Sequence, residues 1–331
     1  MYTGLNMLFV ANHIHDPRTN LALEEFLLRH APVEEILFLF YINEPAVVIG
    51  RNQNAFEEVD PDYLAAHNIQ LVRRLSGGGT VYHDLGNLNF SFISPDRNDL
   101  HNFAKFTAPI VAVLAELGVQ AELRQRSSLF VGDKKISGNA QYASRGRILS
   151  HGTLLFDADL AMLNRAVRPR PLPIESRAIQ SVRANVTNIC DLLPQPMTMD
   201  QLQQMILRRL FGETITTYDL TAADWAKIEQ MRAERYELWE WNIGRSPKFT
   251  VRKSRRFPAG QAAIQLEVEK GHVQHVEIDA DFWDEGQESR LAARLTGLCY
   301  DRQTLAAHLE IDDTFTRLGS MSLADFLEMV I

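Results

Sequence analysis

Two polar runs that contain glycine carry the residue types best suited to chemistry on anions. In residues 73–89 two arginines precede the glycines at 77–79, and residues 132–141 hold Lys135 between two glycines. Glycine lets several backbone N–H groups turn toward one anion, and arginine bonds two phosphate oxygens at once. A lysine amine stabilises an oxygen that gains charge during a reaction. Together they indicate a site for a nucleotide's phosphates beside a second anion, as an enzyme that activates a carboxylic acid with ATP requires.

The surroundings of the first run predict a loop braced between strands, because strand-like residues 69–72 precede it and residues 80–82 follow it. Taken alone, a glycine triplet is more often a tight turn, and adjacent arginines more often form a solvated face. The second run indicates another short glycine loop, which would carry Lys135. Neither run has the Gly-x-x-x-x-Gly-Lys-Ser/Thr or the Gly-x-Gly-x-x-Gly pattern, so a P-loop NTPase and a Rossmann dehydrogenase are disfavoured.

A set of spaced motifs resembles the lipoate-protein ligase A family, within the lipoyl and biotinyl protein ligases, in order and over almost the whole chain. The motifs occupy residues 20–25, 48–54, 73–89, 135–141, 151–155, 181–183 with 186–188, and 239–242. The resemblance implies an α+β fold, in which a mixed-sheet catalytic domain like that of biotinyl and lipoyl ligases spans residues 1–246. A small α+β accessory domain would span residues 247–331, after turn-forming residues at 242–247.

The resemblance also implies a reaction in two steps. Lipoate and ATP would form lipoyl-AMP and pyrophosphate, and the ε-amine of a specific lysine on an apo lipoyl domain would then attack the acyl carbonyl. The acceptors would be the lipoyl domains of 2-oxoacid dehydrogenase complexes and the glycine cleavage H protein. Mg²⁺ would help the glycine-run amides to hold the phosphates.

The matching motifs carry the family's site positions onto this chain. The adenylate-contacting positions fall on Arg74, Gly79, Thr80, Val81 and Tyr82. Lys135 would be the catalytic lysine and would contact both the nucleotide and lipoate, for which Val81 would line an apolar slot. The same pocket would include Ser76, Gly77, Gly78, His83, Gly138 and His151. The ligands of the metal stay unknown.

One departure from the family pattern lies before Lys135. The family usually carries Asn-Asp there, whereas this chain has Ser127 and Ser128, which cannot offer a full negative charge. Asp84 and Asp133 are the nearby acidic candidates, and a solvated loop position is the favoured interpretation of Asp133. The replacement leaves open a noncatalytic binder of lipoate or nucleotide.

The second alternative is a related transferase that moves octanoyl or lipoyl groups without ATP on a cysteine thiolate. This chain has only Cys190 and Cys299, and neither lies near Lys135 in the sequence. Since free cysteine is commonly a small buried residue, we interpret both as structural. Direct activation through a mixed anhydride is therefore favoured.

At 331 residues with a formal net charge of -8, the chain is long enough for two domains and too acidic for a general nucleic-acid partner. The dense basic cluster at residues 252–256 indicates a solvated face or a loop near a hinge, with docking of an acidic lipoyl domain as a hypothesis. The start of the chain lacks a cationic and apolar leader, and the longest apolar run, residues 36–42, is too short to span a bilayer. We therefore expect a cytoplasmic enzyme without a membrane partner.

Periodicity predicts the elements that must position these residues. Helices are expected at residues 21–30 with Asn20 as N-cap, 107–117 before Gly118, 202–211, 222–237, 288–295, 304–309 and 323–330. Strands are expected at residues 36–41, 46–49, 89–93, 129–131 and 152–156. Residues 263–268 and 273–278 predict a hairpin that turns at Lys270 and Gly271.

Overall fold

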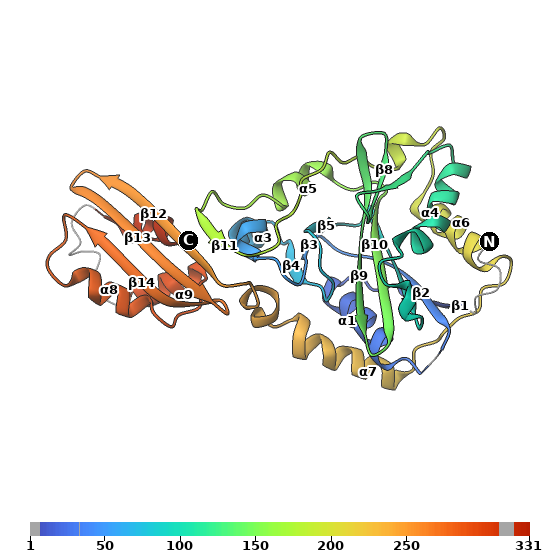
Figure 1. Cartoon of the computed structure of the whole chain (residues 1–331), viewed down its shortest axis with the longest axis horizontal. Coiled ribbons are helices and arrows are strands. Elements are labelled where there is room, and N and C mark those ends of the chain that lie inside the picture. Colours follow the sequence, from blue (N-terminus) through green and yellow to red (C-terminus); the bar gives the residue numbers. More distant parts are fainter. Residues whose placement is uncertain (1–6, 33, 311–320) are drawn as a thin grey trace. The chain divides into compact units, whose positions relative to one another are not determined.

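The computed structural model describes residues 7–32, 34–310 and 321–331, which form two compact units (Figure 1). Unit 1 is drawn from Met1–Arg51, Asp60–Arg168 and Ser181–Leu238, and unit 2 from Asn52–Val59, Pro169–Gln180 and Trp239–Ile331. Unit 2 thus includes two segments that lie far from its main part in the sequence. The predicted domain boundary between residues 246 and 247 remains a proposal.

Unit 1 contains a seven-stranded sheet. In spatial order its strands are β1 (Met7–Val10), β2 (Ile36–Ile42), β6 (Asn87–Ser94), β10 (Arg147–Leu155), β9 (Lys134–Ser144), β8 (Ser128–Val131) and β7 (Glu122–Arg124). Strands β1 and β2 are parallel, and the other neighbours are antiparallel. Strand β2 is buried on both of its faces, as expected where helices cover the two sides of a sheet.

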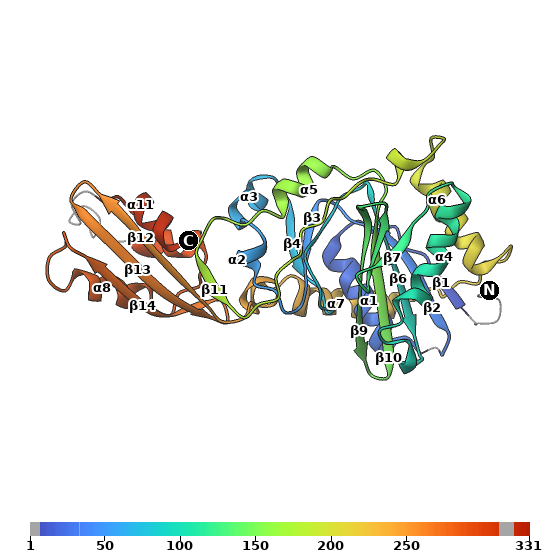
Figure 2. The ribbon, with the colours of Figure 1, turned by 45° about the horizontal axis from the view of Figure 1, so that its top comes forward.

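Helices lie on both sides of this sheet. The described helices of unit 1 are α1 (Pro17–His30), α3 (Pro61–Ala66), α4 (Phe103–Glu116), α5 (Leu160–Ala166), α6 (Met199–Phe211) and α7 (Ala222–Met231), with short turns η1 (Arg97–Asp99) and η2 (Cys190–Leu192) and a π-helical segment η3 (Arg232–Tyr236). Helices α1 and α7 lie on one side and α4 and α6 on the other (Figures 1 and 2). The predicted helix at 222–237 is therefore α7 continued by η3.

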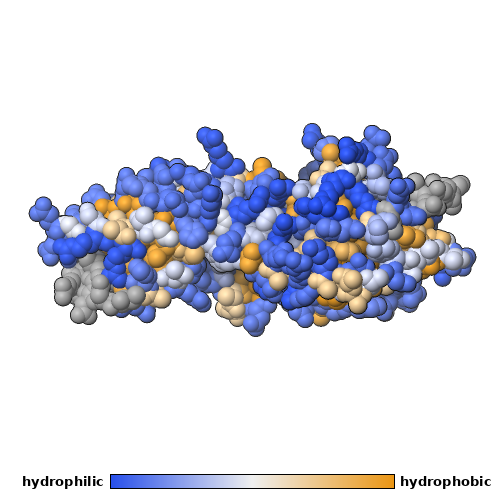
Figure 3. Space-filling view, turned by 90° about the horizontal axis from the view of Figure 1, so that it is seen from below, coloured by the Kyte–Doolittle hydropathy of each residue, from blue (hydrophilic) through white to orange (hydrophobic). Residues whose placement is uncertain are grey.

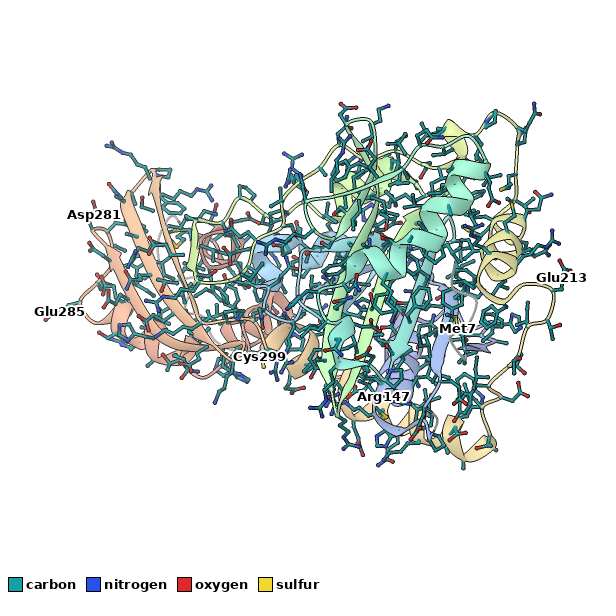
Figure 4. All side chains as sticks on the ribbon, turned by 45° about the vertical axis from the view of Figure 1, so that its right-hand side comes forward. Met7, Arg147, Glu213, Asp281, Glu285 and Cys299 are labelled. Carbon is teal, nitrogen blue, oxygen red and sulfur yellow. The ribbon has the colours of Figure 1, made fainter. Side chains whose placement is uncertain are left out.

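Helix α1 begins at Pro17 rather than at Leu21. Its N-cap is Asp16, whose carboxylate accepts the N–H groups of residues 18 and 19, so the prediction of Asn20 as the cap is wrong. Asn20 is instead buried inside the helix and donates to the Asn43 side chain at 2.7 Å. At the other end, Arg147, labelled in Figure 4, donates to the carbonyls of Leu27 and Ala31 and thereby ties α1 to β10.

A second sheet of unit 1 holds the first glycine-containing run. It consists of β4 (Gln70–Arg73), β3 (Ala46–Ile49) and β5 (Val81–His83), with β3 parallel to β4 and antiparallel to β5. Every residue of β3 is buried, because the strand is apolar throughout and lies in the centre. Residues 74–80, here called the glycine loop, join β4 to β5, as the sequence predicted.

Unit 2 is built on an antiparallel four-stranded sheet. Its strands are β11 (Ile174–Ser176), β12 (Phe249–Phe257), β13 (Gly260–Glu269) and β14 (His272–Ala280), and its described helices are α2 (Ala55–Glu58), η4 (Glu240–Gly244), α8 (Gln287–Leu295), α9 (Arg302–Leu309) and α11 (Leu323–Val330). Phe56 packs its ring against Phe249 and Tyr300, which explains why segment 52–59 belongs to this unit. The predicted hairpin at Lys270 and Gly271 is confirmed, and both residues have positive φ. The predicted α+β class, with a smaller C-terminal α+β part, is confirmed.

Two polar runs form strands where the sequence indicated or allowed loops. Residues 134–144 form strand β9 rather than a short glycine loop, and only the turn at Gly132 and Asp133 is irregular. The basic cluster at 252–256 lies in strand β12 with Arg252, Arg255 and Arg256 exposed, so of its two interpretations the solvated face is confirmed and the loop near a hinge is wrong. In both runs polar side chains on an exposed sheet face masked the strand, because only one face of these strands packs on a core.

Candidate active site

The glycine loop is organised around the guanidinium group of Arg74. Arg74 is only 6 % exposed, and it donates to the Val48 carbonyl at 3.0 Å and to the Gly77 and Gly79 carbonyls at 2.7 Å each. A trans peptide points its C=O and N–H in opposite directions, so the N–H groups that follow these two carbonyls, those of Gly78 and Thr80, turn away from the arginine. The loop thus presents amide hydrogens on its outer side, and Gly78 adopts the required φ of 89°.

Neither arginine of the run forms a solvated face. The neighbouring Arg73 is fully buried and donates to the carbonyls of Gly50 at 3.0 Å and Arg51 at 3.3 Å. Several of Arg74's donors are engaged by the protein itself. Direct bonding of Arg74 to a phosphate therefore stays a proposal.

Lys135 lies opposite Phe130 in strand β9, where a bulge at Ile136 shifts the pairing with β8. In a regular strand residues 135 and 138 would face opposite sides, but the extra residue brings both to one face. A side chain at Gly138 would lie 3.2 Å from the Lys135 amine and 4.0 Å from a methyl group of Val81. The missing side chain at Gly138 therefore gives the amine its place beside Val81.

The Lys135 amine has no acidic partner. Across the described ranges no salt bridge or hydrogen bond to its Nζ is found, and Ser128 lies opposite Gly138 in the β8–β9 pairing. Burial, and then the charge of Arg74, lower the pKa of Lys135 below the ordinary lysine value. This amine is a half-buried cation whose charge remains available to a ligand.

One short segment, residues 181–187, is fastened to both the glycine loop and Lys135. The Ser181 hydroxyl accepts the Thr80 N–H at 2.8 Å, and the Asn185 carbonyl accepts the Lys135 N–H at 2.8 Å. The Thr187 N–H donates to the Lys135 carbonyl at 3.2 Å. In this structure the hydroxyl of Ser181 therefore takes the amide that the sequence assigned to a phosphate.

Ser76 and His151 meet in a buried hydrogen-bond chain with Glu24 of α1. The Glu24 carboxylate accepts from Nδ1 of His151 at 2.9 Å, and Nε2 of His151 lies 2.7 Å from the Ser76 hydroxyl, which accepts from Arg74 Nε at 3.0 Å. Tyr41 and Ser91 also donate to Glu24. Glu24 was not among the predicted site residues, although its position one helical turn from Leu21 and Leu28 places a carboxylate on the buried face of the helix.

Strand β5 divides its side chains between two faces. Val81 and His83 share one face, whereas Tyr82 lies on the other, so only the backbone of Tyr82 is presented beside Val81. Asn43 donates to Nδ1 of His83 at 2.8 Å, and no partner for Nε2 of His83 is found in the described part of the chain. Burial, followed by the charges of Arg74 and His151, lowers the pKa of His83 to about 3, so the ring is a neutral donor.

The acidic candidates do not form a metal centre. Asp84 accepts the N–H groups of Gly86 and Asp159 and so caps local turns, while Asp133 is exposed in the hairpin turn. Within residues 7–32, 34–310 and 321–331 no group of three or more His, Cys, Asp or Glu side chains is arranged to hold a metal ion. The protein side chains seen here therefore supply no ready Mg²⁺ site.

Neither cysteine is prepared to act as a thiolate. Cys190 lies beside Asp157 and Asp191, and burial together with these carboxylates raises the pKa of its thiol to about 11. Cys299, labelled in Figure 4, belongs to unit 2, and burial followed by the charges of Asp301 and Glu240 raises the pKa of its thiol. Both shifts disfavour a thioester mechanism.

The surface adds two facts. The face in Figure 3 is mostly hydrophilic, with small separate apolar areas, and none of the described helices has the length and apolar character needed to cross a bilayer. In the basic cluster, Arg252 pairs with Glu175, Arg255 pairs with Asp325, and Lys253 donates to the Glu328 carbonyl. Much of this positive charge is therefore balanced within unit 2.

Comparison with known proteins supplies the family. Residues 16–211 match the lipoyl protein ligase A/B catalytic domain, and residues 246–330 match the bacterial lipoate protein ligase C-terminus. The chain is 44 % identical to the lipoate-protein ligase LplJ of Bacillus subtilis, over 98 % of this chain and 100 % of that protein.

Two solved structures are similar in fold. One is a lipoate-protein ligase A bound with ATP, with a TM-score of 0.62 and 27 % identity over 72 % of this chain and 99 % of that one. The other is described as a bi-partite lipoate protein ligase and its E2 lipoyl domain from Thermoplasma acidophilum, with a TM-score of 0.62 and 27 % identity over 72 % of this chain and 96 % of that one. By both catalytic and C-terminal matches, and by full-length identity to its relatives, the chain belongs to the lipoate-protein ligase family.

Proposed function

We propose how this chain, as a lipoate-protein ligase, divides its reaction between the glycine loop and Lys135. In the first step the carboxylate of lipoate attacks the α-phosphorus of ATP, which forms lipoyl-AMP as the P–O bond to pyrophosphate breaks. In the second step the ε-amine of an acceptor lysine attacks the acyl carbon. An amide bond forms, the amine loses a proton, and AMP leaves with the electrons of the broken C–O bond.

The observation that carries this proposal is the unpaired Lys135 amine beside Val81. Two anions must approach each other in the first step, and a half-buried cation without an internal counter-ion offsets their repulsion more strongly than a fully exposed one. Since no carboxylate of the described chain competes for Lys135, the amine is free to contact the lipoate carboxylate and the α-phosphate together. The same charge would stabilise the oxygen that becomes negative in the second step.

The other predicted residues have roles that follow from their placement. The outer amides of the glycine loop, at Gly78 and Thr80, would accept the phosphates, with Arg74 fixing the loop from within. Ser181 would release the Thr80 N–H when a phosphate arrives. Val81 and His83, on one face of β5, would contact the acyl chain, while Tyr82 would contribute only its backbone.

Mg²⁺ is proposed only as a companion of ATP. Magnesium is commonly held through substrate phosphates with few protein carboxylates. Because the described residues offer no acidic cluster, we assign it no protein ligand and no step. ATP, lipoate and Mg²⁺ thus remain the proposed small-molecule requirements.

The acceptors are proposed to be apo lipoyl domains of 2-oxoacid dehydrogenase acyltransferase subunits and the glycine cleavage H protein. The support is the family's reaction and the lipoyl domain named with the similar Thermoplasma ligase. We place the reaction in the cytoplasm, where ATP and these apo proteins would meet. The alternative transferase without ATP is disfavoured by the raised pKa of both thiols, and the noncatalytic binder is disfavoured by the unpaired amine.

The deciding experiment is lipoate-dependent exchange of labelled pyrophosphate into ATP, followed by mass spectrometry of an apo lipoyl domain. The Lys135→Ala variant is expected to lose roughly 10²- to 10³-fold of the exchange rate, as for removal of one key charge-stabilising donor. Lys134→Ala, at the exposed neighbour on the same strand, is the matched control. A wild-type protein without exchange would contradict the adenylate route, whereas normal exchange by Lys135→Ala would contradict only the role of that lysine.

A further inference from the structure

Glu24 is a buried carboxylate without a predicted role. It is 2 % exposed in the middle of α1, and its donors within the described chain come from three different strands: Tyr41 from β2, Ser91 from β6 and His151 from β10. A buried charge is retained only when several hydrogen bonds replace its hydration. Burial and the neighbouring Glu24 charge raise the pKa of Tyr41, so its phenol stays a donor to the carboxylate. The carboxylate is therefore a fixed acceptor in the core.

The direction of each hydrogen bond follows from this acceptor. An ionised Glu24 can only accept, so His151 donates from Nδ1, and in a neutral ring this leaves Nε2 as an acceptor for the Ser76 hydroxyl. Ser76 then has its oxygen free to accept the Nε–H of Arg74, at 3.0 Å. The carboxylate thus fixes the ring tautomer, the hydroxyl rotor and one edge of the guanidinium in turn.

The chain ends on the backbone of the glycine loop. The other edge of Arg74 donates to the carbonyls of Gly77 and Gly79, at 2.7 Å each. Turning that guanidinium would turn both peptides and, with them, the amides on the outer side of the loop. We propose that Glu24 and His151 are positioning residues that act through Ser76 and Arg74 to set the glycine loop; the inference rests on the loop's proposed role in holding the nucleotide.

The same three side chains also have the order of a nucleophile, a base and an orienting acid. Ser76, however, is fully buried and already accepts from Arg74, so its oxygen has no open approach for an acyl group. Glu24 is matched by Glu25, the next residue of α1, which is also 2 % exposed but bonds Arg235 and Tyr236 instead. Glu25 is therefore a control for the loss of a buried charge.

The test compares Glu24→Gln, Ser76→Ala, their double variant and Glu25→Gln in the full chain, by pyrophosphate exchange at varied ATP and lipoate. Glu24→Gln and Ser76→Ala are each expected to lose roughly ten- to hundredfold in kcat/KM for ATP, since a misplacement of a substrate-binding group by about 1 Å costs up to about a hundredfold. The KM for lipoate and the exchange by Glu25→Gln should change by less than about twofold. In the double variant Glu24→Gln should add almost nothing, because its route through Ser76 is already broken.

Two results would overturn the positioning role of Glu24 and His151. One is a loss of kcat/KM in the double variant equal to the product of the two single losses, and the other is an equal loss of exchange in Glu24→Gln and Glu25→Gln. Acylation of the peptide that contains Ser76, found by mass spectrometry after reaction with lipoate and ATP, would overturn the positioning role and indicate that Ser76 is a nucleophile.

A second readout needs no activity. In protein labelled with ¹⁵N-glycine, ¹⁵N-threonine and ¹⁵N-histidine, Glu24→Gln and Ser76→Ala should shift the amide signals of Gly78 and Thr80, because these N–H groups belong to the two peptides whose carbonyls accept from Arg74. His151 should carry its proton on Nδ1 in the wild type. Glu25→Gln should leave these signals in place. If the wild type shows the tautomer and the variants show the shifts, but the wild type shows no exchange, the proposed function fails and the positioning role of Glu24 and His151 stands. Unmoved signals of Gly78 and Thr80 in both variants would reject the positioning role itself.

Discussion

The glycine loop holds a buried cation and the Lys135 hairpin a half-buried one, and the two cations have opposite uses. Arg74 donates to three backbone carbonyls and a hydroxyl of the protein, so much of its charge shapes the loop. The Lys135 amine has no acidic partner in the described ranges and is placed by a bulge and by the missing side chain of Gly138. In the glycine loop the Arg74 cation fixes the backbone, whereas in the hairpin the backbone positions the Lys135 cation so that a ligand can contact it.

Among the variants that test this contrast between Arg74 and Lys135, Arg74→Lys is expected to have the largest effect. A lysine cannot reproduce the fork of donors, so the loop carbonyls lose partners. We expect a loss of about 2 to 4 kcal/mol in the free energy of unfolding and roughly a hundredfold loss of exchange. Denaturant unfolding measures the loss of stability, and pyrophosphate exchange measures the loss of activity. Arg73→Lys is the control, because this buried arginine donates to the carbonyls of Gly50 and Arg51 instead. It should lower the stability but reduce exchange less than Arg74→Lys does. Equal losses of exchange in the two variants would contradict a special role of Arg74 in shaping the glycine loop.

A smaller effect is expected for Gly138→Ala. The new methyl group would lie 3.2 Å from Nζ of Lys135, and the flexible side chain would move aside rather than the backbone. Exchange should fall about tenfold because the cation is displaced, while the melting temperature stays close to that of the wild type. A variant with wild-type exchange would show that the position of the amine is not critical.

Ser128→Asp should change the pH dependence. Lys135 must be protonated to act, and its pKa is lowered by burial and Arg74, so exchange should fall with rising pH earlier than an ordinary lysine would allow. A carboxylate at position 128, the cross-strand partner of Gly138, would lie on the face that carries the Lys135 amine, favour the charged amine and raise its pKa, so the alkaline fall moves to higher pH. Ser127→Asp, in the turn, should move it less. Unchanged pH profiles in both variants would contradict the assignment of that limb to Lys135.

The smallest effect is expected for Ser181→Ala. Its hydroxyl accepts the Thr80 N–H at 2.8 Å, so removing it takes away a protein group that competes with a phosphate for that amide. The KM for ATP should fall by about two- to threefold, which is less than the worth of one hydrogen bond. Val182→Ala, at the 85 % exposed neighbour, serves as the control. An increase in KM would mean that Ser181 supports the nucleotide rather than competing with it.

Local signals predicted the fold better than they predicted the site. Apolar runs such as β2 and β3, and the Lys270–Gly271 turn, could be recognised because their residues carry the pattern themselves. The cap of α1 was misplaced because apolar periodicity begins at Leu21, whereas Asp16 followed by Pro17 is the stronger start signal.

The interactions within the site lie beyond local pattern. Glu24 and His151 are separated by 127 positions, and nothing in either neighbourhood indicates the other. Strand β9 was hidden because Gly132 and Gly138 bracket a polar run, and its bulge depends on pairing with β8. The sequence motifs supplied the residue types, but only the fold shows that Arg74 faces inward and Tyr82 faces away from Val81.

Transplanting this site onto another hairpin would require copying an irregularity rather than a motif. On a flat ribbon a lysine and a glycine three positions apart would be separated by the thickness of the sheet. Deleting Ile136 from this chain would make the strand regular and leave the lysine and the glycine two positions apart, on one face again, so the spacing of three works only together with the extra residue. A designer who scores only residue identity would therefore accept a scaffold in which the charge points to the wrong side.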